Sequence, residues 1–286
     1  MSNPIGVSSF AFAFPMTNAA LDTLEQLAAL GYEHVEVCLD DPAHLDPATL
    51  RAAAARNGLT LSIGGVFTAD RDVAAADAAT QRHGIEYLTT CVEFAEAAGA
   101  RIVSGPMYSA AGRTQVMDAR DRSAQRARAA NALRDVADLA AARGITLAIE
   151  PLNRFETDLI NTVDQALALL DVIDRPNVGL AFDTFHAHIE EKDLADAVRA
   201  AGGRLVSFQA SESDRGTPGT GQVHWDDAFA ALRDIGYAGP VIVESFDWTD
   251  PDVAAALSLW RPVAASMPEL VRASIDFLSP YCRTSG

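Results

Sequence analysis

The sequence predicts a single-domain (β/α)8 TIM barrel extending over residues 1–286. Short apolar runs alternate with helical segments along the whole chain, as in a parallel sheet covered by helices. Eight strand–helix pairs in 286 residues average about 36 residues each, a typical size for such a barrel. Several runs also end in an oxygen-bearing side chain, where barrels place their functional residues. A doubly wound open sheet is the alternative, but its usual GxGxxG sequence does not follow the first strand.

The predicted strands are short, mostly apolar and followed by polar or turn-forming residues. In the clearest case an apolar run from Thr146 reaches Glu150, and Pro151 follows at once. Because proline has no backbone N–H to donate to a sheet, that strand should end near Glu150. In chain order the eight predicted strands are 5–10, 34–38, 59–66, 101–105, 146–150, 178–182, 204–209 and 240–244.

The predicted helices are bounded by capping residues and glycines. Asp46 and Pro47 open one helix as an N-cap and a first-turn proline, and Gly58 closes it. The last helix is interrupted at Pro262. In order, the helices are expected at 19–30, from 46 to 58, from the 68–72 loop to 98, from the 108–113 loop to about 144, and at 163–173, 194–201, 226–235 and 252–278.

Composition limits the classes of partner and compartment. The chain is 49% hydrophobic and carries a formal net charge of −17, which disfavours nucleic acid and anionic membranes as partners. Three cysteines without a CxxC spacing argue against a disulfide framework. No signal peptide is visible, and no apolar run reaches the length of a membrane span. We therefore expect a cytoplasmic protein with a small-molecule partner.

Four predicted strand ends carry oxygen ligands: Glu150, Asp183, Gln209 and Glu244. They are separated by 33, 26 and 35 residues, about one strand–helix unit each. On successive strands of one barrel these side chains converge, and three carboxylates without a cation would repel each other. The four residues therefore predict a divalent metal site, with Mg2+ or Mn2+ favoured by oxygen ligands and Co2+ as a further candidate. Taken singly, each could instead be a solvated strand-end residue.

Other polar residues lie near the same predicted strand ends. His186 follows Asp183 by three residues, and Arg215 lies six residues beyond Gln209. The planar fork of Arg215 could bind sugar hydroxyls, orient a carboxylate or form only a surface ion pair. Glu156 lies six residues after Glu150 and could reach a substrate. Glu36 could line the pocket floor or form a buried ion pair, and His188 could be a solvated loop residue.

An ordered set of motifs resembles the ketose 3-epimerases, the D-tagatose and D-psicose 3-epimerase group of the xylose isomerase-like barrels. The likeness covers nearly the whole chain. The motifs are Asp70-Arg-Asp72, Gly105-Pro-Met-Tyr-Ser109, Glu150-Pro-Leu-Asn-Arg-Phe-Glu156, Phe182-Asp-Thr-Phe-His186, Ser211-Glu-Ser-Asp-Arg-Gly216 with Gly219-Thr-Gly221 and Trp225, and Val243-Glu-Ser-Phe246.

The resemblance implies roles for these residues. Glu150, Asp183 and Glu244 fall on metal-ligand positions, and Glu150 and Glu244 also on the two catalytic acid/base positions. Substrate contacts are implied for Glu156, His186 and Arg215. The third ligand position, usually His in these epimerases, is Gln209 here, as in related hydroxypyruvate isomerases. We also expect a homo-oligomer, a dimer or a tetramer.

Metal-dependent epimerisation of free ketoses at C3, through an enediolate, is the function predicted from these residues. An aldose–ketose or hydroxypyruvate-type isomerase using the same metal site is the alternative, and metal-assisted cleavage of a modified glycoside is a further one. A non-catalytic sugar-binding module stays open because fold alone does not fix function. A nuclease on a similar barrel is disfavoured by only six histidines and the negative charge.

Overall fold

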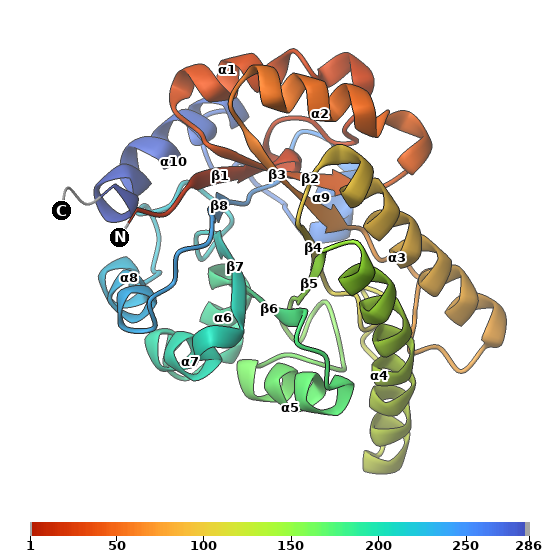
Figure 1. Ribbon diagram of the computed structural model, residues 1–286. Helices are drawn as coiled ribbons and strands as arrows, with labels where there is room; N and C mark the ends of the chain where they lie inside the picture. The colour runs from red at the N-terminus through yellow and green to blue at the C-terminus, as the bar shows by residue number, and fades with distance from the viewer. Residues whose placement is uncertain (1, 284–286) are drawn as a thin grey trace.

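The computed structural model describes residues 2–283, and within them eight parallel strands close into one barrel in sequence order. Figure 1 looks along this barrel, with the helices arranged around it. Ser2 and Arg283, the ends of the described part, pair in an isolated antiparallel bridge. The strands are β1 Ile5–Ser8, β2 His34–Leu39, β3 Thr60–Gly65, β4 Ile102–Gly105, β5 Thr146–Ile149, β6 Val178–Asp183, β7 Leu205–Ala210 and β8 Val241–Val243. The predicted (β/α)8 barrel is confirmed; its outermost expected residues, 1 and 284–286, lie outside the described part.

The strands are buried because helices cover the outside of the barrel and side chains fill its inside. Every residue of β2 and β6 is buried. This explains why β6 reads as an apolar run. In β2 the polar residues His34 and Glu36 alternate with valines and are buried as well. The closing pair is β1 with β8, in which Val7 lies opposite Val243. Closure leaves no free sheet edge in the barrel.

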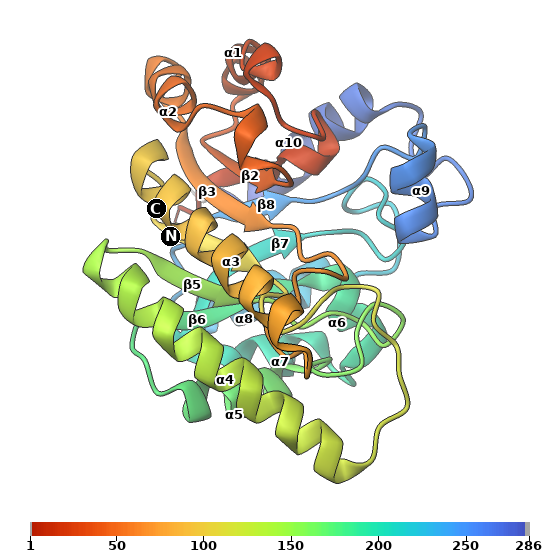
Figure 2. The ribbon, with the colours of Figure 1, turned by 90° about the vertical axis from the view of Figure 1, so that its right-hand side faces the viewer.

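The α-helices follow the strands in the expected alternation. They are α1 Thr23–Leu30, α2 Pro47–Arg56, α3 Ala78–Ala98, α4 Ala119–Ala142, α5 Val163–Ile173, α6 Thr184–Glu190, α7 Leu194–Ala201, α8 Trp225–Asp234, α9 Pro251–Leu257 and α10 Met267–Cys282. The interruption predicted at Pro262 is confirmed, since it lies between α9 and α10. Figure 2 shows α9 apart from the main ring of helices. Along residues 2–283, none of the helices combines the length and apolar character needed to cross a membrane.

Three expectations were wrong in detail. Helix α6 was not predicted; the side chain of Asp183 caps it by accepting a hydrogen bond from the Phe185 N–H at 2.7 Å. The first helix begins at Thr23 rather than at residue 19, because Asn18–Ala20 forms a separate 3-10 turn. Strand β1 ends at Ser8, two residues early, because Ser9–Ala11 also forms a 3-10 turn.

Candidate active site

The structure brings the four predicted ligands to the C-terminal ends of neighbouring strands. Glu150 directly follows β5, Asp183 ends β6, Gln209 is the penultimate residue of β7, and Glu244 directly follows β8. Asp183 and Gln209 lie opposite each other in the β6–β7 register. All four side chains are buried, with 2–6% of each residue exposed. Buried carboxylates this close together require compensation by a cation or by protons.

Arg215 lies inside this cluster. Its Nη1 donates hydrogen bonds to Asp183 Oδ2 at 2.6 Å and to Glu244 Oε2 at 3.0 Å. The guanidinium also stacks near the rings of Phe185 and Phe246, at 4.1 and 5.0 Å from the ring centroids. The residue is 4% exposed, so the alternative of a surface ion pair is wrong.

The third predicted ligand, Gln209, has its amide nitrogen and oxygen in different surroundings. Its Nε2 donates to Glu36 Oε1 at 3.1 Å and to Glu244 Oε1 at 3.3 Å. Its Oε1 is buried and accepts no hydrogen bond from the described residues. An unpaired buried acceptor costs about 1–3 kcal/mol, and a bound cation would satisfy it. The amide oxygen and the surrounding carboxylates therefore fit a hard divalent ion.

A second geometric grouping includes His186. Oxygens of Glu150 and Asp183 and a ring nitrogen of His186 lie within 4.8 Å of one another, close enough to hold a metal ion together. His186 Nε2 is 3.5 Å from Glu150 Oε1. A buried Glu/Asp/His triad is thus present where the sequence predicted a metal site. From the sequence, His186 is expected to contact the substrate and not the metal.

The acid groups of the cluster titrate differently. Burial raises the pKa of Glu150 and of Glu244 well above the ordinary value for a glutamate, and the charge of Asp183 adds to this effect. Burial acts in the same direction on Asp183 and is the largest single effect, but the charges of Arg215 and His186 and the hydrogen bonds to this carboxylate together outweigh it and lower the pKa of Asp183 to about 2. Carboxyl groups whose pKa values are pushed apart in one site are typical of acid–base catalysis.

A cavity of about 1010 Å³ opens above the cluster. Its polar floor includes Glu150, Glu156, Arg215 and Glu244. Its walls are mostly apolar, and α9 with the chain that follows it contributes to them. The aromatic residues in the walls are Phe10, Phe14, Phe67, Phe155, Phe185, Phe246 and Trp260. The predicted substrate residues Glu156 and Arg215 therefore face the same space as the predicted acid/base pair.

Comparison with known proteins decides the family. The profile of the xylose isomerase-like TIM barrel family matches residues 24–280. This chain belongs to that family. It is 35% identical over 253 residues to an L-ribulose 3-epimerase of Methylomonas sp. (strain DH-1), covering 88% of this chain and 87% of the relative. It is 36% identical over 253 residues to a ketose 3-epimerase of Arthrobacter globiformis, covering 87% and 86%.

A solved structure of a related protein agrees with this assignment. The D-allulose 3-epimerase from Methylomonas sp., crystallised with D-allulose, superposes with a TM-score of 0.91 at 32% identity, covering 98% of this chain and 97% of that one. The expected resemblance to the ketose 3-epimerase group is confirmed. These relatives are enzymes of the isomerase class, so the expected enzyme class is confirmed as well.

Glu36 has a role that neither expectation described. It is 1% exposed, so it does not line the pocket floor, and among residues 2–283 no cation pairs with it. It accepts hydrogen bonds from Ser104 Oγ at 2.5 Å and from Gln209 Nε2. Burial raises its pKa, although these hydrogen bonds act in the opposite direction. By accepting a hydrogen bond from Gln209 Nε2, Glu36 fixes the orientation of this amide, whose Oε1 is left unpaired.

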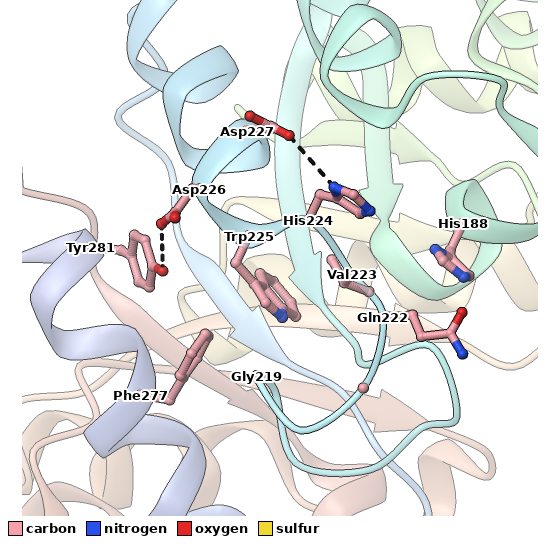
Figure 3. Close-up of a pocket in the computed structure, with 11 residues that line it drawn as sticks. His188, Gly219, Gln222, Val223, His224, Trp225, Asp226, Asp227, Phe277 and Tyr281 are labelled. Carbon is pink, nitrogen blue, oxygen red and sulfur yellow. Dashed lines mark hydrogen bonds and ion pairs between the residues drawn. The ribbon is translucent and has the colours of Figure 1, made fainter.

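A second hollow, of about 690 Å³, is lined by residues of α8, α10 and neighbouring segments (Figure 3) and shares no lining residue with the first cavity. Its lining includes His188, His224 and Trp225. His224 Nδ1 lies 3.6 Å from Asp227 Oδ2, an exposed ion pair within one helical turn. None of the predicted site residues, all of which the structure describes, lines this hollow.

Glu212 supports the segment that carries Arg215 into the site. Its carboxylate accepts four hydrogen bonds from N–H groups of the 213–225 segment: Ser213 N, Gly219 N, Val223 N and Trp225 Nε1, at 2.8–3.1 Å. Its backbone oxygen accepts from Arg215 N at 2.9 Å. Arg215 has a φ of +63°, which costs a non-glycine residue free energy and persists only where neighbours enforce it. Sequence reasoning missed Glu212, whose only signal was its place in the Ser-Glu-Ser-Asp-Arg-Gly motif.

We expect Glu212→Gln to lower the free energy of unfolding by about 1.5–3 kcal/mol near neutral pH. In wild type both carboxylate oxygens of Glu212 accept hydrogen bonds from N–H groups. A glutamine replaces one of these oxygens with an NH2 group, which cannot accept from an N–H donor. Burial alone would raise the pKa of Glu212, but the N–H donors outweigh it and lower the pKa. The stabilisation is therefore present above the unfolded pKa of about 4.3 and is lost as pH falls through the lower folded value.

Urea unfolding of wild type and Glu212→Gln across the acid range checks this prediction. The difference in stability should be largest near neutral pH and should shrink in acid. Glu86→Gln, on the exposed face of α3, is the matched control and should change little. A stability difference that stays constant from neutral to strongly acid pH would contradict the charge-based account.

Proposed function

We propose that this chain epimerises free ketoses at C3, with Glu150 and Glu244 as the paired acid and base. The observation that carries the proposal is the position of these two carboxyl groups. They follow β5 and β8, which are not neighbours in the barrel, and both face one cavity. Epimerisation needs a proton removed from one face of a carbon and another returned on the opposite face, and two separate carboxyl groups can do both.

We further propose that Glu150, Asp183, Gln209 and Glu244 hold a divalent metal, Mn2+ or Mg2+, with Co2+ as a further candidate. The unpaired Gln209 Oε1 and the three buried carboxylates support this set. Such an ion, when bound, polarises the ketone oxygen and stabilises negative charge on it. It would also favour the charged forms of Glu150 and Glu244 and so lower their raised pKa values.

In this proposal, side chains of the protein transfer the protons and bind the substrate. One glutamate removes the C3 proton, which leaves an enediolate flat enough to be attacked from either face. The other glutamate returns a proton to the opposite face of C3. Arg215 and Glu156 line the cavity, where Arg215 can donate a hydrogen bond to a substrate oxygen and Glu156 can accept one from a hydroxyl. His186 borders Glu150 and is not one of the residues that line the cavity, so its contact with the substrate is proposed from the family resemblance.

The walls of the cavity favour an unphosphorylated sugar. The cations that line the cavity within the described residues are Arg215 and Arg261. Both are already paired, Arg215 with Asp183 and Glu244, and Arg261 Nη2 with Asp214 Oδ2 at 2.9 Å. A phosphate would find no free cation there, while the apolar walls suit the carbon–hydrogen faces of a free ketose.

An aldose–ketose or hydroxypyruvate-type isomerase is the second candidate, favoured by Gln209 at the third ligand position. The same acid/base pair serves it if the second proton returns to the neighbouring carbon. Incubating the metal-loaded protein with a panel of free ketoses in D2O separates the two. A 3-epimerase gives the C3 epimer with deuterium at C3, whereas an isomerase gives an aldose with deuterium at C2. Failure to turn over any ketose, with metal bound, would contradict both.

Arg215→Lys should raise KM and lower kcat/KM about 10- to 100-fold. A lysine ammonium is a point charge and cannot reach Asp183, Glu244 and a substrate oxygen with one planar fork. Steady-state kinetics on the preferred ketose checks this. Arg233→Lys, at an exposed position near the end of α8, is the matched control. Kinetics equal to wild type would remove Arg215 from the proposed mechanism.

The homo-oligomeric state and the cytoplasmic location stay predictions. Sedimentation equilibrium of the purified protein tests the first, with a dimer or tetramer expected. Fractionation of cells that express the protein tests the second.

A further inference from the structure

Arg113 connects three of the chain segments that follow strands at the cavity end of the barrel. It lies in the segment after β4, and its Nη1 donates to Asp72 Oδ2, in the segment after β3, at 2.8 Å. Its Nε and Nη2 donate to Asp158 Oδ1, in the segment after β5, at 3.0 and 2.8 Å. Only 13, 7 and 8% of these three side chains are exposed, so salt screens the two ion pairs little. One guanidinium therefore ties together three segments that lie far apart in the sequence.

The same three segments are joined by backbone hydrogen bonds where they line the cavity. Ala111 N donates to Phe67 O at 2.8 Å, and Gly112 N donates to Glu156 O at 2.7 Å. All four of these residues line the cavity, whereas Arg113, the next residue along the chain, is not one of its described lining residues. Arg113 thus lies behind this wall and is placed to act on a ligand only through it.

Glu156 is the residue of this wall that is proposed to bind the substrate. Its backbone oxygen is held by Gly112, and the residue after it, Thr157, pairs with Arg113 in an isolated parallel bridge. One residue further along, Asp158 binds the guanidinium. Consecutive Cα atoms are about 3.8 Å apart, so an anchor two residues away leaves Glu156 little freedom to shift. The position of its carboxylate in the cavity therefore depends on Arg113.

The contacts of Arg113 require a planar fork. Asp72 and Asp158 bind different nitrogens of the guanidinium, and Gln125 Oε1 accepts a further hydrogen bond from Nη2 at 2.8 Å. A lysine ammonium is a point charge on a flexible stem and cannot bind all three acceptors in these places. Arg113→Lys would therefore keep a positive charge between the two buried carboxylates while releasing the geometry.

We propose that Arg113 is a positioning residue for substrate binding, which sets the place of the Glu156 carboxylate in the cavity wall. The inference rests on the proposed function for the identity of the substrate as a free ketose. It also gives a role to Asp72, part of the Asp70-Arg-Asp72 motif, as the second anchor of Arg113. Glu156 binds a hydroxyl and does not exchange the C3 proton, so displacing it weakens binding of substrate and transition state alike. Such a loss raises KM and leaves kcat nearly unchanged.

Hydrogen exchange of backbone amides, followed by 1H–15N nuclear magnetic resonance without any sugar, tests the connection to Glu156. In Arg113→Lys the Gly112 N–H, which is bonded to Glu156 O, should exchange at least about 10-fold faster than in wild type. The Leu147 N–H, bonded to Asn177 O at the start of β5, should exchange as in wild type. Unchanged exchange at Gly112 would overturn the proposal, and so would equally faster exchange at both amides.

Steady-state kinetics on the ketose that the panel identifies tests the consequence for binding. Arg113→Lys should raise KM about 10-fold, the effect of weakening one hydrogen bond to a charged group, with kcat within about 2-fold of wild type. In a Glu156→Ala background the same change should leave KM within about 2-fold, because the carboxylate on which Arg113 acts is gone. Equal increases of KM in both backgrounds would show that Arg113 does not act through Glu156.

Asp158→Asn is a second variant, which carries the same tests if Arg113→Lys does not fold. The two Asp158 oxygens accept from N–H groups of Arg113 and of Gln115, so an asparagine, with one oxygen and one NH2 group, cannot satisfy both. This variant should also raise KM and speed exchange at Gly112. Wild-type KM and wild-type exchange in Asp158→Asn would contradict the proposed connection.

Arg175→Lys is the matched control. Arg175 also binds a carboxylate, that of Asp138, through Nε and Nη2, but it precedes β6 at the other end of the barrel. Losing this pair should leave KM and the exchange of Gly112 unchanged, and an increase of KM equal to that in Arg113→Lys would overturn the proposal. Because exchange at Gly112 is measured without a sugar, its failure is distinct from failure of the proposed function, which the ketose panel tests.

Discussion

Glu150→Gln and Glu244→Gln should each abolish measurable ketose turnover while the barrel stays folded. Each change removes an acid/base group but keeps the shape of the side chain. Loss of one general acid or base typically costs about 10²–10⁴ in rate, and weaker metal binding adds to that loss. Burial raises the pKa of both groups above the ordinary value for a glutamate, as is common for carboxyl groups that act as acid and base.

The two variants should also differ from each other if the two glutamates act on opposite faces of C3. For a given epimer, the C3 proton points toward one of the two glutamates. The variant that keeps that glutamate should still exchange the C3 proton with D2O, even though it completes no epimerisation. Running the reaction from each of the two C3 epimers should therefore exchange the roles of Glu150 and Glu244. Near-normal turnover in either variant with metal bound would contradict the two-carboxylate mechanism. Glu86→Gln, on the surface of α3, serves as the unaffected control.

Gln209→Leu should weaken binding of Mg2+ and Mn2+ by at least about 10- to 100-fold. Removing a residue that only hydrogen-bonds to a metal ligand already costs that much affinity, and Gln209 is proposed as a ligand itself. Leucine supplies no oxygen, and it leaves three buried carboxylates around the ion with fewer ligands. It also removes the hydrogen bonds that Gln209 Nε2 donates to Glu36 and Glu244. Titration followed by activity and by thermal shift measures the effect, because a bound metal raises the melting temperature.

Gln209→His separates the ligand role from the packing role. An imidazole nitrogen suits later transition metals better than an amide oxygen does, so preference should move toward Co2+ or Ni2+. Gln222→Leu, an exposed glutamine in the segment after β7, is the matched control and should bind metal like the wild type. Equal metal affinity in wild type and Gln209→Leu would show that Gln209 is not a ligand, and the Glu150, Asp183 and His186 grouping would then take its place.

Sequence patterns predicted the barrel because each strand and each helix is encoded by a short, continuous stretch of sequence. A buried strand needs a short apolar run, a helix needs a capping residue and a stop, and both signals lie within about ten residues. Helices α5 and α7 match their predicted bounds for this reason. Helix α6 was missed because it is seven residues long and is capped by Asp183, a residue already interpreted as the end of a strand.

The sequence by itself determined that Glu150, Asp183, Gln209 and Glu244 stand at strand ends, since that follows from strand length and spacing. Only the tertiary structure decided which groups face one another there. The burial of Arg215 among the carboxylates and the contact of Glu36 with Gln209 join residues 29 and 173 positions apart. No local pattern encodes such contacts, because the closed barrel, and not the chain between them, sets the distance between its strand ends.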